Sequence, residues 1–217
     1  MKVFLQNKYL IDFFATVMFF TRIPINWTYF SDKAPDLTRA AWSFPIVGFL
    51  IGIISGICGE FCILVKLPIF LSCTIAVAAS LMITGAFHED GLADMADGFG
   101  AGGSPEKINE IMHDSRLGTY GTSALTLGLL IRIGITIALV DLGYSMLIIL
   151  AISFASGKLA ILFMRNFSYP SNFAKTGTII EYISFKKILL ATIIWSIAVV
   201  FIFPFFSILL GIFLASV

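Results

Sequence analysis

"LPIFLSCTIAVAASLMITGAF", residues 67–87, is an apolar run without a charged residue, and it leads directly into "HEDGLADMADGFGAGG", residues 88–103. The run is long enough for one membrane-spanning helix, which needs about 20 apolar residues. The stretch that follows places four carboxylates within nine residues. The junction therefore predicts a membrane helix that ends in an acidic segment at the membrane edge.

The composition extends this prediction to the whole chain. Of its 217 residues, 59% are hydrophobic and 12% are charged, whereas soluble domains carry about a quarter charged residues. We expect an all-α fold: one integral membrane domain over 1–217, a polytopic helical bundle with about five to seven transmembrane segments. The formal net charge of +1 singles out no anionic partner, and we expect membrane lipid and no nucleic acid as partners. Homo-oligomerisation stays open.

Six apolar stretches are candidate membrane segments: 9–23, 43–65, 67–87, 118–140, 145–164 and 188–217. The first is short and carries Asp12 and Arg22, so it lies in the interface or enters the bilayer only partly. The last contains Pro204 and is either one kinked helix or a hairpin of short helices. The N-terminus shows no cleavage site, and we expect it to be retained. Three cysteines lie in apolar runs, and we interpret them as core residues without disulfides: Cys58, Cys62 and Cys73.

Charge distribution predicts the orientation. If segments two to five each cross once, loops 24–42, 88–117 and 165–187 share one face and carry eight Lys or Arg residues. The turns at the opposite face carry Lys66 and Asp141. Because positive loops stay inside, we expect the acidic loop to face the cytosol.

The acidic segment has helical spacing. Asp94 lies about 40° from Asp90 around a helix, and Asp97 about 20° to the other side. Three carboxylates on one arc repel one another and need a cation. Carboxylates without cysteine suit a hard divalent ion such as Mg²⁺, Mn²⁺ or Ca²⁺. Gly91 and Gly98 share an adjacent arc, where a second helix or a phosphate-bearing ligand can approach the backbone.

A second helix is predicted after this segment, with Ser104 as its N-cap, Pro105 as its first residue and Gly118 at its end. We interpret Glu106, Glu110 and His113 as solvated surface. "MHDSRLGTYG", residues 112–121, adds a carboxylate, a hydroxyl and a guanidinium suited to phosphate, which belong to Asp114, Ser115 and Arg116.

Two cations, Arg132 and Lys158, lie within apolar segments, where charge is costly. They neutralise the acidic site, bind a substrate phosphate or form structural ion pairs, and the sequence leaves these alternatives open.

Carboxylates with a hard metal, beside glycines and basic residues, favour phosphoryl transfer between substrates, with an Asp or His88 near an acceptor hydroxyl. The alternatives are another Mg-dependent nucleotide-alcohol phosphotransferase of the membrane and a divalent-cation transporter. A transporter is expected to place acidic residues within its spans. Asp12 and Glu60 are the only acidic candidates within apolar segments of this sequence, and they form no cluster.

Two blocks resemble the cobalamin synthase (adenosylcobinamide-GDP ribazoletransferase) family. They are His-x-Asp-Gly-Leu-Ala-Asp-x-x-Asp-Gly at 88–98 and Met-x-Asp-Ser-Arg-x-Gly at 112–118. "FFTRIPI" and "WSFPIVGFLIG" are also similar to the opening segments of that family. The resemblance covers most of residues 13 to about 180.

The resemblance implies a multi-pass transferase of the bacterial cytoplasmic (inner) membrane that acts late in cobalamin (vitamin B12) biosynthesis. It would use Mg²⁺ to join α-ribazole, or its 5′-phosphate, to adenosylcobinamide-GDP, giving adenosylcobalamin or its phosphate and GMP. The active-site region would be 85–121. The implied catalytic residues are Asp90, Asp94, Asp97, Asp114 and His88, and the four aspartates are also the implied Mg²⁺ ligands. The implied substrate-binding residues are Arg116, Arg22, Gly91, Gly98 and Ser115.

One departure from the family pattern concerns the C-terminal region. Members carry a Gly-Gly-x-Thr-Gly-Asp block and a final membrane helix after the last apolar run, and no such block occurs in this sequence. The residues are compatible with a chain that is active without the block and with one that is not.

Overall fold

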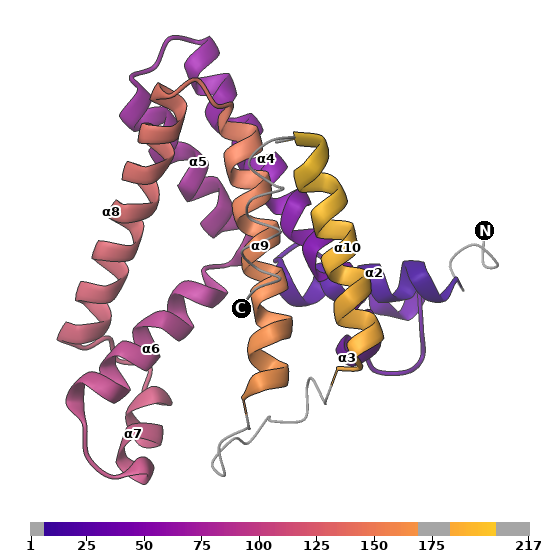
Figure 1. The fold of residues 1–217 in the computed structure, drawn as a ribbon. Coiled ribbons are helices and arrows are strands. Elements are labelled where there is room, and N and C mark those ends of the chain that lie inside the picture. Colours follow the sequence, from indigo (N-terminus) through magenta and orange to yellow (C-terminus); the bar gives the residue numbers. More distant parts are fainter. Residues whose placement is uncertain (1–6, 169–182, 203–217) are drawn as a thin grey trace.

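The computed structural model describes residues 7–168 and 183–202, and every regular element in that part of the chain is helical. Figure 1 shows the arrangement. The α-helices are α2 (Lys8–Phe20), α3 (Leu37–Ala40), α4 (Phe44–Leu64), α5 (Ile69–Thr84), α6 (Phe87–Ala101), α7 (Pro105–Met112), α8 (Thr119–Asp141), α9 (Met146–Phe167) and α10 (Phe185–Ile202). Two short 3₁₀ helices, η1 (Trp27–Tyr29) and η2 (Ala41–Ser43), lie before α4. The all-α prediction is confirmed for this part.

Three helical stretches are long and apolar enough to cross a membrane: Leu37–Leu64, Thr119–Asp141 and Met146–Phe167. A fourth span results if α5 and α6 are counted together as one broken span. The described part therefore has three or four candidate spans, fewer than the five to seven expected for the whole chain. Helix α2 has 13 residues, about 20 Å, which is too short for a core of about 30 Å. Most of the predicted segment 188–217, including Pro204, lies outside the described residues.

Helices α4 and α9 form the centre of the bundle because glycines let their backbones come close. Four glycines of α4 follow one another at helical spacing and face α9: Gly48, Gly52, Gly56 and Gly59. A Cβ on Gly52 would lie 2.5 Å from the Cα of Ala151. Small residues at such spacing let membrane helices pack closely.

The hydrophobic core beside this pair is aromatic where α2 crosses it. The rings of Phe20 and Phe44 meet edge to face with centroids 4.8 Å apart, and both side chains are fully buried. Asp12 of α2 is also buried, and its carboxylate accepts a 2.6 Å hydrogen bond from Arg39 Nε. A buried charge needs such a partner, so Asp12 ties α2 to α3.

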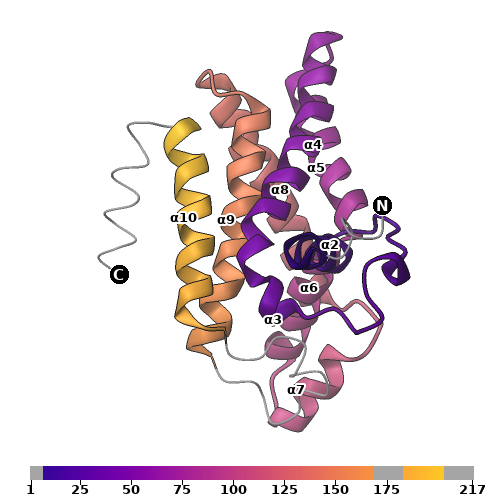
Figure 2. The same cartoon turned by 90° about the vertical axis from the view of Figure 1, so that its right-hand side faces the viewer.

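Figure 1 shows two ends of the molecule. The turns between α4 and α5 and between α8 and α9 lie at one end, and α6, α7, the end of α9 and the start of α10 lie at the other. The view turned by 90° shows α9 and α10 side by side and α7 at the same end as before (Figure 2). At the first end, Glu60 of α4 accepts hydrogen bonds of 2.7 Å from Ser145 Oγ and from the N–H of Met146. Glu60 therefore caps α9.

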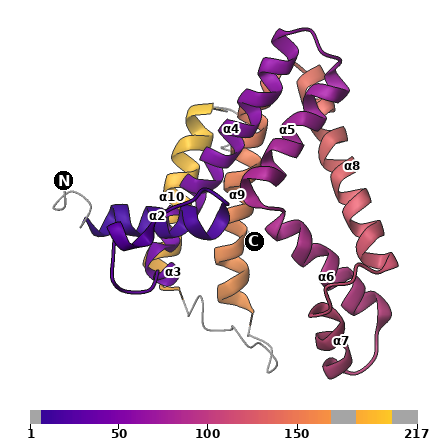
Figure 3. The ribbon, with the colours of Figure 1, turned by 180° about the vertical axis from the view of Figure 1, so that it is seen from behind.

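The chain bends by 90° between α5 and α6 (Figure 3). Gly85 and Ala86 both have a positive φ, 67° and 56°. At Gly85 a Cβ would also overlap the side chain of Arg22. Both the positive φ and the close approach of Arg22 therefore require glycine at this position. The bend turns the acidic helix α6 away from the direction of the membrane helix α5.

The three cysteines, Cys58, Cys62 and Cys73, are free thiols in α4 and α5, as predicted. Ser104 caps α7 through a hydrogen bond from the N–H of Lys107 and Pro105 opens the helix, again as predicted. The prediction that this helix runs to Gly118 is wrong. It ends at Met112 because the N–H groups of His113 and Asp114 turn back to carbonyls three residues earlier.

Candidate functional site

Helices α6, α7 and α8 bring the two sequence blocks together. Gly98 on α6 faces α7, and a Cβ there would lie 2.6 Å from Met112 Cγ. Gly100, the last residue but one of α6, lies against the ring of Tyr120 at the start of α8. Gly91 is different, because nothing lies within 4 Å of the position of its Cβ. The predicted glycine arc thus separates into a helix contact at Gly98 and an open position at Gly91.

Asp97 fastens α6 to the first turn of α8. Its side chain is buried, and its two oxygens accept hydrogen bonds of 2.8 Å from the backbone N–H groups of Gly118 and Gly121. A helix leaves its first N–H groups without intrahelical partners, and a carboxylate there also meets the positive end of the helix dipole. A Cβ on Gly121 would collide with Asp97. The glycines of the second block therefore make room for the carboxylate of the first.

Asp114 and Arg116 form an ion pair in the loop before α8. Arg116 donates from Nη2 to Asp114 Oδ2 at 2.5 Å and from Nε to Oδ1 at 3.0 Å. The hydrogen bonds from Arg116 lower the pKa of the Asp114 carboxyl, and the same bonds raise the pKa of Arg116. The guanidinium side chain is exposed, so it can meet a ligand from solvent.

A cavity of about 290 Å³ lies where these groups meet. Its lining includes Asp97, Asp114, Arg116, Gly118 and Tyr120. It thus joins one carboxylate of the first block to the carboxylate, guanidinium and helix N-terminus of the second. A guanidinium attracts phosphate, whereas the N–H groups of Gly118 and Gly121 already donate to Asp97.

Asp90 and Asp94 lie one turn apart on α6, as predicted. Asp90 is exposed and Asp94 is half-buried, and neither side chain has a hydrogen bond or ion pair within the described residues. Over residues 7–168 and 183–202, no three His, Cys, Asp or Glu side chains gather closely enough to hold a metal ion. The predicted four-aspartate set is therefore divided between two free carboxylates and two that already have partners.

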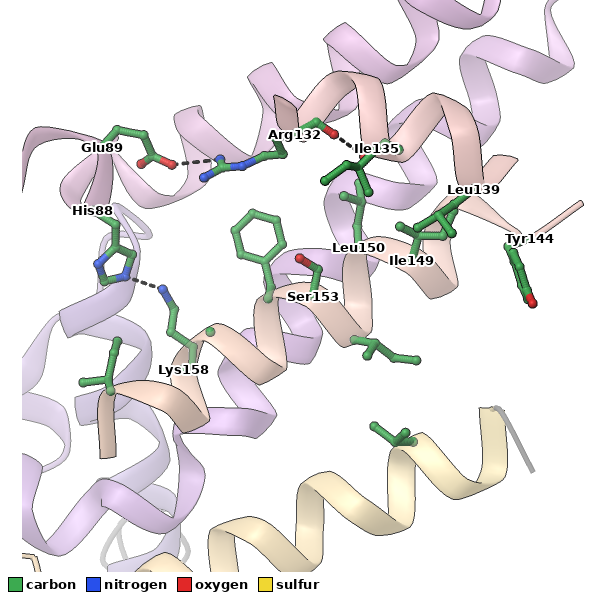
Figure 4. A pocket seen from close by; sticks show the side chains of 16 residues that line it. His88, Glu89, Arg132, Ile135, Leu139, Tyr144, Ile149, Leu150, Ser153 and Lys158 are labelled. Carbon is green, nitrogen blue, oxygen red and sulfur yellow. Dashed lines mark hydrogen bonds and ion pairs between the residues drawn. The ribbon is translucent and has the colours of Figure 1, made fainter. Parts of the chain in front are cut away.

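The remaining candidates, Ser115, Arg22 and His88, do not line the cavity of about 290 Å³. Ser115 is exposed in the loop beside Asp114. Arg22 is exposed and lies against Gly85 at the bend before α6. His88 turns to a larger cavity between α8 and α9, where its Nε2 is hydrogen-bonded to Lys158 Nζ (Figure 4).

Sequence reasoning missed some members of both cavities. Gly121 and Tyr120 follow the second block, and the sequence places Gly121 at the mouth of the next membrane segment. Their partners, Asp97 and Gly100, lie 24 and 20 residues earlier in the chain, so only the fold shows these contacts. Glu89 was grouped with the acidic segment, but it pairs with Arg132 at 2.8 Å. The position of Arg132 within an apolar segment is the sequence signal for this pair. Of the alternatives open for Arg132, the structure supports the ion pair.

Together these features describe a polytopic helical membrane protein with an acidic helix and an arginine-bearing loop that meet at the N-terminus of a membrane helix. The chain belongs to the cobalamin-5-phosphate synthase family, whose model matches residues 12–217.

Relatives named adenosylcobinamide-GDP ribazoletransferase are similar to the chain. The protein of Xanthobacter autotrophicus is 43% identical over 132 residues, 59% of this chain and 50% of its own length. That of Clostridium botulinum (Kyoto, type A2) is 41% identical over 157 residues, 70% of this chain and 60% of its own length. That of Shewanella frigidimarina is 47% identical over 122 residues, 55% of this chain and 45% of its own length. The chain thus spans about half of these relatives. No solved structure matches it.

Proposed function

We propose that the chain is an Mg²⁺-dependent adenosylcobinamide-GDP ribazoletransferase. It would join α-ribazole or its 5′-phosphate to adenosylcobinamide-GDP and release GMP. Family membership and the names of the relatives support this assignment. The observation that carries it is the cavity at the start of α8, where Asp97, Asp114 and Arg116 meet.

The donor set fits Mg²⁺. This ion is usually held by one or two carboxylates, with water and substrate phosphates completing its shell. Asp90 and Asp94 supply two free carboxylates on one face of α6. Asp97 and Asp114 already accept hydrogen bonds, but a carboxylate has about four lone-pair sites, so coordination stays open to them. Bound Mg²⁺ would neutralise charge on the pyrophosphate and on the departing nucleotide.

The protein groups have separate roles in the proposal. Arg116 binds phosphate oxygens from the mouth of the cavity, and Arg22 adds a second guanidinium near the start of α6. The open backbone at Gly91 and the hydroxyl of Ser115 adjoin the same ligand. His88 has Nε2 bonded to Lys158, which leaves Nδ1 to orient the acceptor hydroxyl. The hydroxyl oxygen forms a bond to the phosphorus next to cobinamide, the bond from that phosphorus to the GMP oxygen breaks, and GMP leaves while the hydroxyl proton passes to solvent.

Cation transport has less support. The two acids that lie in apolar segments both have partners: Asp12 pairs with Arg39, and Glu60 caps α9. An ion path would need such carboxylates free to meet the ion.

GMP release in proteoliposomes tests the proposal, with adenosylcobinamide-GDP and each acceptor in turn, with and without Mg²⁺. We expect release that needs both substrates and the metal and that falls about 100-fold or more in Asp94→Asn. Glu110→Gln, which removes an exposed carboxylate of α7, is the matched control and should keep wild-type activity. Release independent of Mg²⁺, or full activity in Asp94→Asn, would refute the metal assignment. Release with a different alcohol acceptor alone would identify another phosphotransferase.

A further inference from the structure

A second and larger cavity, of about 660 Å³, lies between α8 and α9, with Val199 of α10 and the start of α6 at its margins (Figure 4). Most of its wall is aliphatic, with contributions from Ile135, Leu139, Ile149, Leu150, Ile152 and Ile161. Both helices that form the wall are candidate membrane spans. The cavity therefore lies at membrane depth and favours a hydrocarbon chain.

One end of the cavity is polar. Lys158 is 3% exposed, and its ammonium group contacts His88 Nε2 and lies 4.5 Å from the centre of the Phe20 ring. Next to it, Arg132 is already paired with Glu89 at 2.8 Å. Among the described residues that line the cavity, this end has one carboxylate and two cations, which gives an excess of one positive charge when His88 is neutral.

An excess charge inside a membrane protein is costly and is normally offset by a partner. Neither an imidazole nor an aromatic ring supplies a negative charge to Lys158. An anionic group at the polar end would supply it and would also reach Arg132. The apolar wall excludes a small hydrophilic anion as the main occupant, because such a ligand would leave most of the cavity unfilled.

We propose that this cavity binds an anionic phospholipid of the bilayer, with one acyl chain along the aliphatic wall and its phosphate at Lys158 and Arg132. Lys158 and Ile149 lie nine residues apart on α9, which corresponds to about 13 Å. That distance matches roughly half of a hydrocarbon core of about 30 Å, the depth that one acyl chain occupies. Only 6% of the apolar window of α8 is buried within the molecule, so lipid has direct access to the cavity. The proposal rests on the lining of this cavity and not on the transferase reaction, although His88, which the proposed reaction also uses, contacts Lys158 here.

Lipid retention tests the proposal with the full chain. The protein is reconstituted with equal amounts of phosphatidylcholine and phosphatidylglycerol of matched chains, extracted in mild detergent, and its retained lipid is measured by native mass spectrometry. We expect wild type to retain phosphatidylglycerol about fivefold over phosphatidylcholine, the preference expected for a single additional cationic contact.

Two variants remove the site by different means. Lys158→Met removes the cation, and Gly157→Phe fills the cavity from a position where no atom lies within 4 Å of the Cβ. Both should lose the preference. The matched controls should keep it: Gly134→Phe, at an equally open glycine of α8 outside the cavity lining, and Lys186→Met, which removes an exposed cation of α10.

Circular dichroism and gel filtration establish that each variant is folded. If Lys158→Met does not fold, Gly157→Phe decides the result by itself. Equal retention of both lipids by wild type, or an unchanged preference in Gly157→Phe, would overturn the proposal. So would a wild-type dimer without retained lipid that becomes monomeric in Gly157→Phe, because a second copy of the chain would then occupy the cavity.

Discussion

At the scale of single residues, the carboxylate of Asp97 faces two backbone N–H groups in the first turn of α8. Asn at this position retains one oxygen and loses the charge that meets the helix dipole. We expect Asp97→Asn to lower the free energy of unfolding by about 1–2 kcal/mol. Thermal unfolding in detergent, followed by circular dichroism, measures this loss.

Asp90→Asn is the matched control, since Asp90 is exposed on the same helix. Its effect on stability should stay within about 0.5 kcal/mol, although we expect it to lower GMP release. Equal stability of the two variants would show that Asp97 is not a helix cap.

The ion pair of Asp114 with Arg116 predicts a pH dependence. The hydrogen bonds of Arg116 lower the pKa of the Asp114 carboxyl, so the folded protein keeps this group ionised to lower pH than the unfolded chain does. Its contribution to stability is therefore present above the ordinary carboxyl pKa of about 3.9 and is lost as the pH falls through the lowered pKa. Arg116→Gln should raise this pKa, as measured by NMR titration of the labelled carboxyl. Lys186→Gln, at the start of α10, should leave the titration unchanged.

At the scale of helices, the glycines of α4 determine how closely α9 can pack. A Cβ on Gly52 would lie 2.5 Å from backbone atoms of Leu150 and Ala151. We expect Gly52→Ala to lower the free energy of unfolding by about 1–3 kcal/mol because backbone atoms cannot move aside cheaply. Unfolding in a denaturing detergent measures the effect.

Gly134→Ala tests the opposite case on α8, where the added methyl group meets nothing within 4 Å. Since alanine favours a helix by up to about 1 kcal/mol over glycine, this variant should be as stable as wild type or more so. A similar loss in both variants would mean that flexibility, and not close packing, explains the glycines of α4.

At the scale of the whole molecule, the charge at the two ends of the bundle predicts which end faces the cytosol. Loops rich in Lys and Arg stay on the cytosolic side, and α7 lies at the end opposite the turn between α8 and α9 (Figure 1). In a chain with its three cysteines replaced by alanine, Glu106→Cys should react with an impermeant maleimide only when the cytosolic face is accessible. Leu142→Cys, which is 73% exposed at the other end, should react from outside. The reverse pattern would invert the proposed orientation, and labelling of both from one side would contradict the arrangement of the helices.

Composition and local pattern alone determined the all-helical membrane class, most helix ranges, the cap at Ser104 and the acidic stripe of α6. These properties depend on hydrophobicity and on contacts within a few residues, which a sequence shows directly. The same reasoning placed the end of α7 six residues too late. The turn that ends this helix is stabilised by backbone hydrogen bonds, which require no particular residue types, so the sequence does not indicate it.

Only the tertiary structure decided which charges meet. Asp97 reaches N–H groups 21 and 24 residues further along the chain, and His88 reaches Lys158 at a separation of 70 residues. Helical spacing placed Asp90, Asp94 and Asp97 on one arc, but the packing of α6 on α8 buried Asp97 alone and left the other two accessible. Charges find partners across helices because burial makes an unpaired charge costly, and which partner is within reach depends on how the helices pack.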